Sequence, residues 1–443
     1  MDSAGKQKVG LLLLARMVVE RTCDKEYLSH VAETSDLPNL SLKMTDISSP
    51  SASTENTIAE AVTDLSLTLR NPGVTVDRDL LEAYVTAAAP NSIRALRQDV
   101  EVFDLWCRRE GLQTFPALPK QVANWLKHRA AEGAAPASLV RYKASIAKAH
   151  RLLGLEDPTK HELCRLAIAA HRRAVGSKQK QARPLRFRGA VKDPVQDTPR
   201  GIHIRAILEA CDDAPTGLRN RALLSTAYDT GLRASELVAV EVADLIEALD
   251  PEARLLAIDR HKGDQEGEGS TAYLSPRSVK AIDAWLEAAK IESGPIFRRV
   301  IVRRYAARPA RKAIKPAQLS GRALWDRRKF VGRDAVAARV EHHVGDKALH
   351  PGSITPIFRK MIAQAIDAGA FGDLDKEQAR ELVKGFSAHS TRVGLNQDLF
   401  AVGETLAGIM DALRWKSPKM PLAYNRNLAA EAGAAGRLLS KLD

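Results

Sequence analysis

The chain has 443 residues, of which 45% are hydrophobic and only 5% aromatic, and its formal net charge at pH 7 is +13. This length is enough for two or three domains, and no run of about 18 apolar residues suggests a membrane span. The four cysteines are widely separated, which argues against a disulfide framework and favours a reducing, cytoplasmic compartment.

The first 78 residues are rich in Ser and Thr and carry more acidic than basic side chains. Because such a composition can bury little apolar surface, we expect residues 1–78 to form a disordered N-terminal extension. The negative charge of this segment argues against a DNA-binding arm.

From about residue 79 the apolar residues follow a helical period, with Asn91 or Ser92 as a candidate N-cap of the first long helix. One stripe of that helix would bury Leu96, Val100, Phe103 and Trp106. Several further helices follow, separated by Gly and Pro residues. Residues 79–175 therefore predict a small all-helical domain.

Basic residues in and after this domain are candidate DNA contacts. In the expected helix 137–154, the side chains of Arg141, Lys143 and Lys148 point away from the core, although a solvated basic helix would explain them equally well. Residues 176–200 show no period and contain Gly, Pro and many basic residues, so they predict a basic interdomain linker. Its Arg186 and Arg188 are further candidate DNA contacts.

The remaining residues, 201–443, predict a second domain that is mainly helical. Helices are expected around 201–211 and 217–229, and two strand-like runs, 254–262 and 270–275, flank the Gly-rich sequence GDQEGEG as in a hairpin. The predicted fold class is therefore mainly α with a small antiparallel β-sheet in the second domain.

A long basic insert interrupts this domain at about residues 300–350. Between Arg298 and Arg339 there are 14 Lys or Arg residues against two acidic ones. A charge run is ordinarily a solvated face, but this one, together with the acid-poor run in the linker, favours a polyanionic partner such as DNA. The insert also contains EHHVGDKALH, residues 341–350, for which we expect a polar surface loop rather than a metal site.

Short motifs in the second domain carry residues suited to phosphodiester chemistry. That chemistry needs preorganised cations to stabilise the charge on the phosphate oxygens, a nucleophile, and an acid for the leaving oxygen. In TGLRASEL, residues 230–237, Arg233 follows a Gly-Leu turn at the start of an expected helix, and Glu236 could orient its guanidinium group. Taken alone, this is also an ordinary helix start.

The other candidates follow along the chain. Lys262 ends the first hairpin strand, and AHSTRVG at 388–394 places His389 and Arg392 on one face of a helix. Trp415 and Tyr424 lie in RWKSPKMPLAYNRNL, residues 414–428. Each feature has a simpler explanation when judged alone: an exposed lysine, a chance H-x-x-R pair, or a core aromatic residue.

In order and spacing, however, the set resembles the tyrosine recombinases, the lambda-integrase family. The family pattern is Arg, a hairpin Lys, His-x-x-Arg, His or Trp, and then the nucleophilic Tyr; the matching positions are Arg233, Lys262, His389, Arg392, Trp415 and Tyr424. The resemblance covers about residues 79–443. The chain departs from the pattern in its long insert, in Arg414 where a small residue is expected, and in Pro421, which is expected to disturb a helix leading to the nucleophile.

The resemblance implies a site-specific DNA recombinase that acts through a 3′-phosphotyrosine intermediate and a Holliday junction. Arg233 and Arg392 would clamp the phosphate, Tyr424 would attack, Lys262 would protonate the leaving oxygen, and His389 would handle a proton. Trp415 would donate to a phosphate oxygen, and Glu236 would support Arg233 from behind. No metal or nucleotide cofactor is implied.

The resemblance also implies a two-domain clamp on double-stranded DNA that carries a specific inverted-repeat target. Four protomers would assemble on it, with a C-terminal docking helix at about 429–443, and the protein would work in the cytoplasm in association with the nucleoid. Two alternatives remain: a type IB topoisomerase or telomere resolvase with the same catalytic residues, or a non-catalytic sequence-specific DNA-binding protein.

Overall fold

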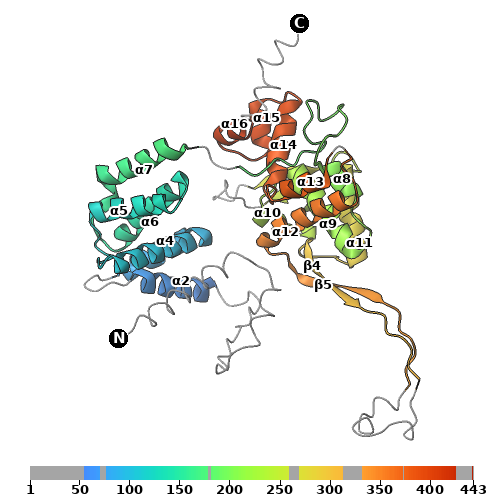
Figure 1. The fold of residues 1–443 in the computed structure, drawn as a ribbon, viewed down its shortest axis with the longest axis horizontal. Coiled ribbons are helices and arrows are strands. Elements are labelled where there is room, and N and C mark those ends of the chain that lie inside the picture. The colour runs from blue at the N-terminus through green and yellow to red at the C-terminus, as the bar shows by residue number, and fades with distance from the viewer. Residues whose placement is uncertain are drawn as a thin grey trace. The chain divides into compact units, whose positions relative to one another are not determined.

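The structure is a computed structural model that describes residues 54–69, 76–177, 181–258, 269–312, 332–372, 374–425 and 442 (Figure 1). The chain divides into two compact units, residues 1–178 and 179–443. Within the described ranges, no helix combines the length and the apolar character needed to cross a membrane.

The described residues of the first unit form helices joined by turns and loops, with no strand among them. The unit consists of α2 (Thr54–Leu69), α3 (Arg78–Ala87), α4 (Pro90–Arg109), α5 (Pro119–Ala131), α6 (Pro136–Leu152) and α7 (Glu162–Val175). α4 begins at Pro90 rather than after an Asn91 or Ser92 cap, because proline needs no N–H partner in the first turn of a helix. The apolar stripe expected in α4 is buried as predicted.

Helix α2 differs from the expectation of a disordered extension. Its Val62, Leu65 and Leu69 are buried and pack in one cluster with Leu81 and Val85 of α3. These three residues recur every three or four positions, so they form one stripe on the helix. The prediction missed this short apolar stripe because it was made from the average composition of residues 1–78, which is rich in Ser and Thr.

The second unit is built around α9, which contacts α11 and α14. Its helices are α8 (Ile204–Glu209), α9 (Pro215–Thr230), α10 (Ala234–Ala239), α11 (Pro276–Ala289), α12 (Ile354–Asp367), α13 (Lys376–Val383), α14 (Ser390–Ala401), α15 (Leu406–Ala412) and α16 (Lys419–Tyr424). The core of this unit includes fully buried Trp285 and Phe358.

A three-stranded antiparallel sheet joins these helices, in the order β1 (Leu245–Glu247), β2 (Arg254–Ile258) and β3 (Ser270–Leu274). β2 and β3 are the two strands predicted from the sequence. They bury Leu256 and Ile258 on β2, and Ala272 and Leu274 on β3, as period-2 alternation requires. The predicted fold class, mainly α with a small antiparallel sheet, is confirmed.

The basic insert contains two long strands that the sequence analysis did not predict. β4 (Arg298–Tyr305) and β5 (Arg339–Ala348) form a separate antiparallel ribbon. The histidine-rich segment therefore lies on a strand rather than in a loop, and the adjacent residues His342 and His343 point to opposite faces of it. Among the described residues, no group of three His, Cys, Asp or Glu side chains could hold a metal ion.

Candidate active site

The junction between α9 and α10 positions the first arginine. Gly231 ends α9 in the left-handed conformation (φ 57°), and a Cβ there would lie 2.4 Å from the Leu413 side chain. Two residues later, Arg233 is the N-cap of α10, and its backbone N–H donates to a Glu236 carboxylate oxygen at 2.9 Å. Arg233 Nη1 donates to the other oxygen at 2.6 Å, so Glu236 orients the guanidinium group as expected.

Glu236 stays ionised despite its burial. Burial alone would raise the pKa of Glu236, but hydrogen bonds from the Arg233 backbone and side chain, together with the charge of Arg392, lower it below its ordinary value. The Glu236 carboxylate is therefore negatively charged and balances part of the positive charge of Arg233 and Arg392.

Arg392, in the first turn of α14, is completely buried. Its Nη1 donates to the Gly231 carbonyl at 2.5 Å, and its Nη2 donates to the Leu413 carbonyl. Its Nε is buried and has no partner among the described residues. Burial, reinforced by the charges of Arg233 and Arg414, lowers the pKa of Arg392 to about 9, so the group is still a cation at neutral pH.

His389 and Tyr424 meet beside Arg392. The His389 Nε2 and the Tyr424 hydroxyl are 2.7 Å apart, within hydrogen-bond distance. Burial and the charges of Arg392 and Arg233 lower the pKa of His389 to about 4, so its ring is neutral at pH 7. A neutral ring within hydrogen-bond distance of the hydroxyl can accept its proton, as a general base must.

The pKa of Tyr424 is raised above its ordinary value by the balance of two opposing influences. Burial raises it, while the positive charges of Arg392 and Arg233 act to lower it.

Trp415 packs against both Tyr424 and Arg392. Its ring centroid is 5.7 Å from that of Tyr424, and the Arg392 guanidinium carbon lies 4.8 Å from the Trp415 ring centroid.

The helix that carries Tyr424 forms despite its prolines. Pro418 is the N-cap of α16, and Pro421 is the third helical residue. The first turn of a helix has no internal partners for its N–H groups, so a proline there breaks no hydrogen bond. Pro421 therefore does not disturb this helix, contrary to the expectation from the sequence.

Arg414 stabilises the C-terminal end of α9, next to Arg392. It adopts a left-handed backbone conformation (φ 52°), and its Nη2 donates to the Thr230 carbonyl at 2.7 Å. Arg414 and Arg392 thus bind the last two carbonyls of the α9 terminus, where the negative end of the helix dipole favours cations. This contact gives a structural role to an arginine where a small residue was expected.

The remaining predicted catalytic residue, Lys262, lies outside the described residues. The described end of β2 does lie close to the site: a pocket of about 330 Å³ is lined by Leu232 and Glu236 together with Ala257 and Ile258. Lys262 follows four residues after Ile258.

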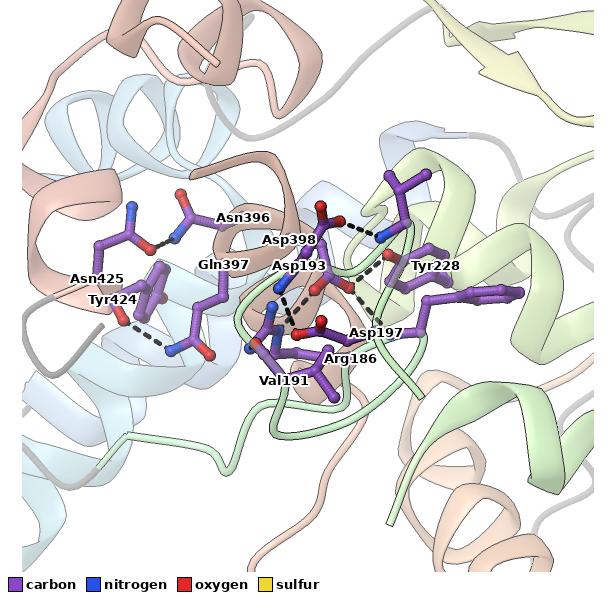
Figure 2. A network of polar contacts seen from close by, with 12 residues as sticks. Arg186, Val191, Asp193, Asp197, Tyr228, Asn396, Gln397, Asp398, Tyr424 and Asn425 are labelled. Atoms are coloured by element: carbon purple, nitrogen blue, oxygen red, sulfur yellow. Dashed lines mark hydrogen bonds and ion pairs between the residues drawn. The ribbon is translucent and has the colours of Figure 1, made fainter. Parts of the chain in front are cut away.

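The second half of α14 holds polar residues that the sequence analysis missed (Figure 2). The Gln397 side chain donates to the Tyr424 carbonyl at 3.0 Å, and the Asn396 amide donates to the Asn425 side chain at 2.7 Å. Both contacts hold the end of α16 against α14. The run Asn-Gln-Asp in a helix with little amphipathic character was the available signal, because three consecutive positions spread over more than half of the circumference of a helix and cannot all face solvent when the helix is packed on several sides.

The third residue of that run, Asp398, binds the segment expected to be a linker (Figure 2). It accepts from Arg186 Nε at 2.5 Å, from the Phe187 N–H at 2.9 Å and from the Tyr228 hydroxyl at 2.6 Å. Burial and this carboxylate raise the pKa of Tyr228 well above its ordinary value. Residues 183–200 therefore belong to the second unit.

Arg186 is consequently not a DNA contact, because its side chain is buried in the ion pair with Asp398. The other candidates keep some exposure but have partners in the protein. Arg141 pairs with buried Asp99, the Lys148 ammonium lies 4.8 Å from the Tyr84 ring centroid, and Arg188 donates to the Asp197 carbonyl. For Lys143, which is half-buried, the prediction stands as made.

The chain resembles known recombinases in sequence. Residues 200–329 match the model of the phage integrase family. The Cre recombinase of Escherichia phage P1 is 27% identical over 344 residues, which are 76% of this chain and 84% of that protein. An integrase/recombinase XerD homolog from Selenomonas ruminantium is 28% identical over 219 residues, 47% of this chain and 60% of the homolog.

A solved structure of the Tn1549 transposon integrase with transposon right end DNA covers 83% of this chain and 94% of that one, with a TM-score of 0.46 and 10% identity. The sequence matches agree with the contacts of this site. His389 contacts Tyr424, Trp415 contacts both Tyr424 and Arg392, and the charge of Arg233 acts on the pKa values of His389, Arg392 and Tyr424. Residues 200–329 therefore match the phage integrase family, and the chain is similar in sequence to the tyrosine recombinases named above.

Proposed function

We propose that this protein is a site-specific recombinase that cuts and rejoins DNA strands through a 3′-phosphotyrosine intermediate. The observation that carries the proposal is the 2.7 Å hydrogen bond between His389 and Tyr424, formed next to the guanidinium group of Arg392. A tyrosine paired with a neutral base and placed beside fixed cations is suited to attack a phosphodiester.

In the cleavage step, Arg233 and Arg392 bind the non-bridging oxygens of the scissile phosphate and stabilise the added charge. The unpartnered Nε–H of Arg392 supports this role, since a phosphate oxygen would supply the missing acceptor. Trp415 packs against both Arg392 and Tyr424. Its indole N–H would donate to the same phosphate.

The proton balance follows from these positions. The Tyr424 oxygen forms a bond to phosphorus and gives its proton to His389, while the bond from phosphorus to the 5′ oxygen breaks. Lys262 supplies the proton to that departing oxygen. The new ester to Tyr424 conserves the energy of the broken one, so a free 5′-hydroxyl can reverse the reaction without an added energy source.

The partner that follows from this chemistry is double-stranded DNA. The proposal has further parts. The DNA carries a specific inverted-repeat target, which the two units hold as a clamp. Four protomers assemble through residues 429–443, and the protein acts in the cytoplasm in association with the nucleoid. Residues 429–441 and 443 lie outside the described residues.

The test is to trap covalent protein–DNA adducts from fragmented genomic DNA and to sequence the attached ends. We expect adducts at one short inverted-repeat sequence with the wild-type protein, none with Tyr424→Phe, and normal yield with Tyr273→Phe, a control at an exposed tyrosine of β3. Adducts that persist in Tyr424→Phe would show that another residue attacks.

The same experiment separates the alternatives. A type IB topoisomerase would give Tyr424-dependent adducts at unrelated sequences and would relax supercoiled plasmids that lack the enriched site. A non-catalytic DNA-binding protein would give no adducts from any variant while still binding DNA.

A further inference from the structure

The long ribbon formed by β4 and β5, defined here as residues 298–312 and 332–348, has no part in the chemistry described above. Its register is regular from Val300 opposite Val344 to Tyr305 opposite Arg339. Two isolated bridges, Arg308 with Val336 and Arg311 with Arg333, continue the same register. At about 3.3 Å per residue, the stretch from residue 300 to residue 311 is about 36 Å long.

Only the base of the ribbon packs on its own unit. Val300 and Val344 lie against the core, whereas Tyr305, Val336 and Val340 further out are 37%, 50% and 53% exposed. Figure 1 shows the ribbon leaving the helices of this unit and extending away from them. A two-stranded ribbon with no covered face is only marginally stable in water, so a partner that covers it would stabilise it.

The charge of the ribbon identifies the chemistry of that partner. The ribbon holds ten Lys or Arg residues against three Asp or Glu residues. Arg299, Arg303, Arg304 and Arg308 form no ion pair with any residue in the described part of the chain. Unpaired guanidinium groups on an exposed strand match phosphate oxygens in both charge and geometry.

The spacing of the arginines also fits a duplex. Arg304 and Arg308 are four residues apart and thus share one face, separated by about 13 Å along the strand. The DNA backbone carries a phosphate every 3.4 Å or so of axial rise on each strand, so this separation corresponds to about four phosphates. The full ribbon is about as long as one turn of B-DNA, whose major groove admits a two-stranded ribbon.

We propose that this ribbon is a second DNA-binding element, which lies along duplex DNA beyond the segment held at the active site. The inference rests on the proposed function, because it assigns the ribbon to the DNA partner of that activity. A second copy of the chain is a poorer partner for this surface, since two ribbons with the same excess of positive charge would repel each other.

The test uses a 60-bp duplex of random sequence, because binding without a target site is dominated by phosphate contacts and depends steeply on salt. Binding of the full chain is measured by fluorescence anisotropy between 50 and 200 mM KCl. We compare the wild type with Arg304→Gln/Arg308→Gln, and with Arg205→Gln/Arg380→Gln as a control that removes two exposed arginines of the same unit outside the ribbon.

We expect the ribbon variant to lower the slope of log affinity against log salt by about 1.8, at roughly 0.9 for each phosphate that an arginine no longer neutralises. Its affinity would therefore fall about tenfold less than that of the wild type across the salt range. The control variant should change the slope by less than half as much. Equal effects of the two variants, or no change in slope for the ribbon variant, would overturn the inference.

Two further outcomes keep this inference separate from the proposed function. If DNA binding depends on the ribbon as expected but no Tyr424-dependent adducts form, the proposed recombinase activity is wrong and the ribbon is still a DNA-binding element. A ribbon variant that changes self-association in sedimentation velocity without DNA, while binding the duplex like the wild type, would make the ribbon a protein interface instead.

Discussion

At the residue scale, the site is a set of charges whose protonation is controlled by burial. Two guanidinium groups and one carboxylate surround a neutral histidine and a protonated tyrosine. Burial raises the pKa of Tyr424 above its ordinary value, and the charges of Arg392 and Arg233 oppose that shift. Burial and the same charges lower the pKa of His389, which leaves its ring neutral and able to accept a proton at neutral pH.

The first prediction concerns the pH dependence of stability. His389 has a folded pKa of about 4, below its unfolded value of about 6.5, so the unfolded chain binds the proton first as pH falls. The contribution of the neutral ring is present above pH 6.5 and is lost as the pH falls towards 4. Relative to His389→Gln, the wild type should lose about 2 kcal/mol of unfolding free energy between pH 7.5 and pH 5.

Urea unfolding of both proteins at the two pH values measures this difference. A loss that is equal in His389→Gln and the wild type would mean that the ring is not held neutral by its surroundings.

The second prediction concerns Arg233, whose side chain is 27% exposed and thus contributes less to packing than buried Arg392. Arg233→Ala should lower the cleavage rate by about 10²-fold or more, as loss of one preorganised donor typically does. Arg233→Lys should recover only part of the rate, because an ammonium group keeps the charge but not the planar fork. Single-turnover cleavage of a suicide substrate decides the matter, and a rate for Arg233→Ala within threefold of wild type would remove this residue from the phosphate clamp.

At the element scale, α14 connects the parts of the site. His389 is its N-cap, Arg392 lies in its first turn, and its second half holds α16 through Asn396 and Gln397. Leu185 crosses α14 so closely that a Cβ on Gly394 would lie 1.9 Å from the Leu185 carbonyl oxygen. The segment after the unit boundary is therefore fixed to the same helix that carries two of the candidate catalytic residues.

The third prediction tests the buried pair between this segment and α14. Arg186→Met should destabilise the second unit by about 3–5 kcal/mol, because it leaves the Asp398 carboxylate buried without its cation. Arg186→Met/Asp398→Asn should recover part of that loss, since the uncompensated charge is gone. Denaturant unfolding of the two variants and of Asp398→Asn closes the cycle, and a double variant no more stable than Arg186→Met would argue against a charge effect.

At the scale of the whole molecule, the first unit depends on residues that its composition assigned to an extension. Val62, Leu65 and Leu69 of α2 fill a cluster with residues of α3, α4 and α6. The N-terminal boundary of the folded unit therefore lies before residue 60.

The fourth prediction follows from that boundary. Deleting residues 1–53 should leave thermal stability and DNA binding nearly unchanged, whereas deleting residues 1–78 should destabilise the first unit. The longer deletion removes three buried apolar side chains, each worth about 1.5–3 kcal/mol. Differential scanning calorimetry of the two truncated proteins provides the comparison, and equal melting profiles would mean that α2 is dispensable for the first unit.

The sequence by itself predicted the fold class and a set of candidate catalytic residues. The ordered set of Arg233, His389, Arg392, Trp415 and Tyr424 was recognisable because its order and spacing resemble the tyrosine recombinase pattern, whose members stand in short local motifs. The β2–β3 hairpin was recognisable for the same reason, since turn residues and period-2 alternation are local properties of the chain.

Only the tertiary structure decided which side chains are buried and what they contact. Arg186 and Arg188 looked alike in a basic segment, yet Arg186 is buried against Asp398, which is 212 residues away in sequence. The contact of Gln397 with α16, and that of Arg414 with the end of α9, are likewise long-range. Partners of this kind depend on how elements pack, and no pattern within a short window of sequence encodes that packing.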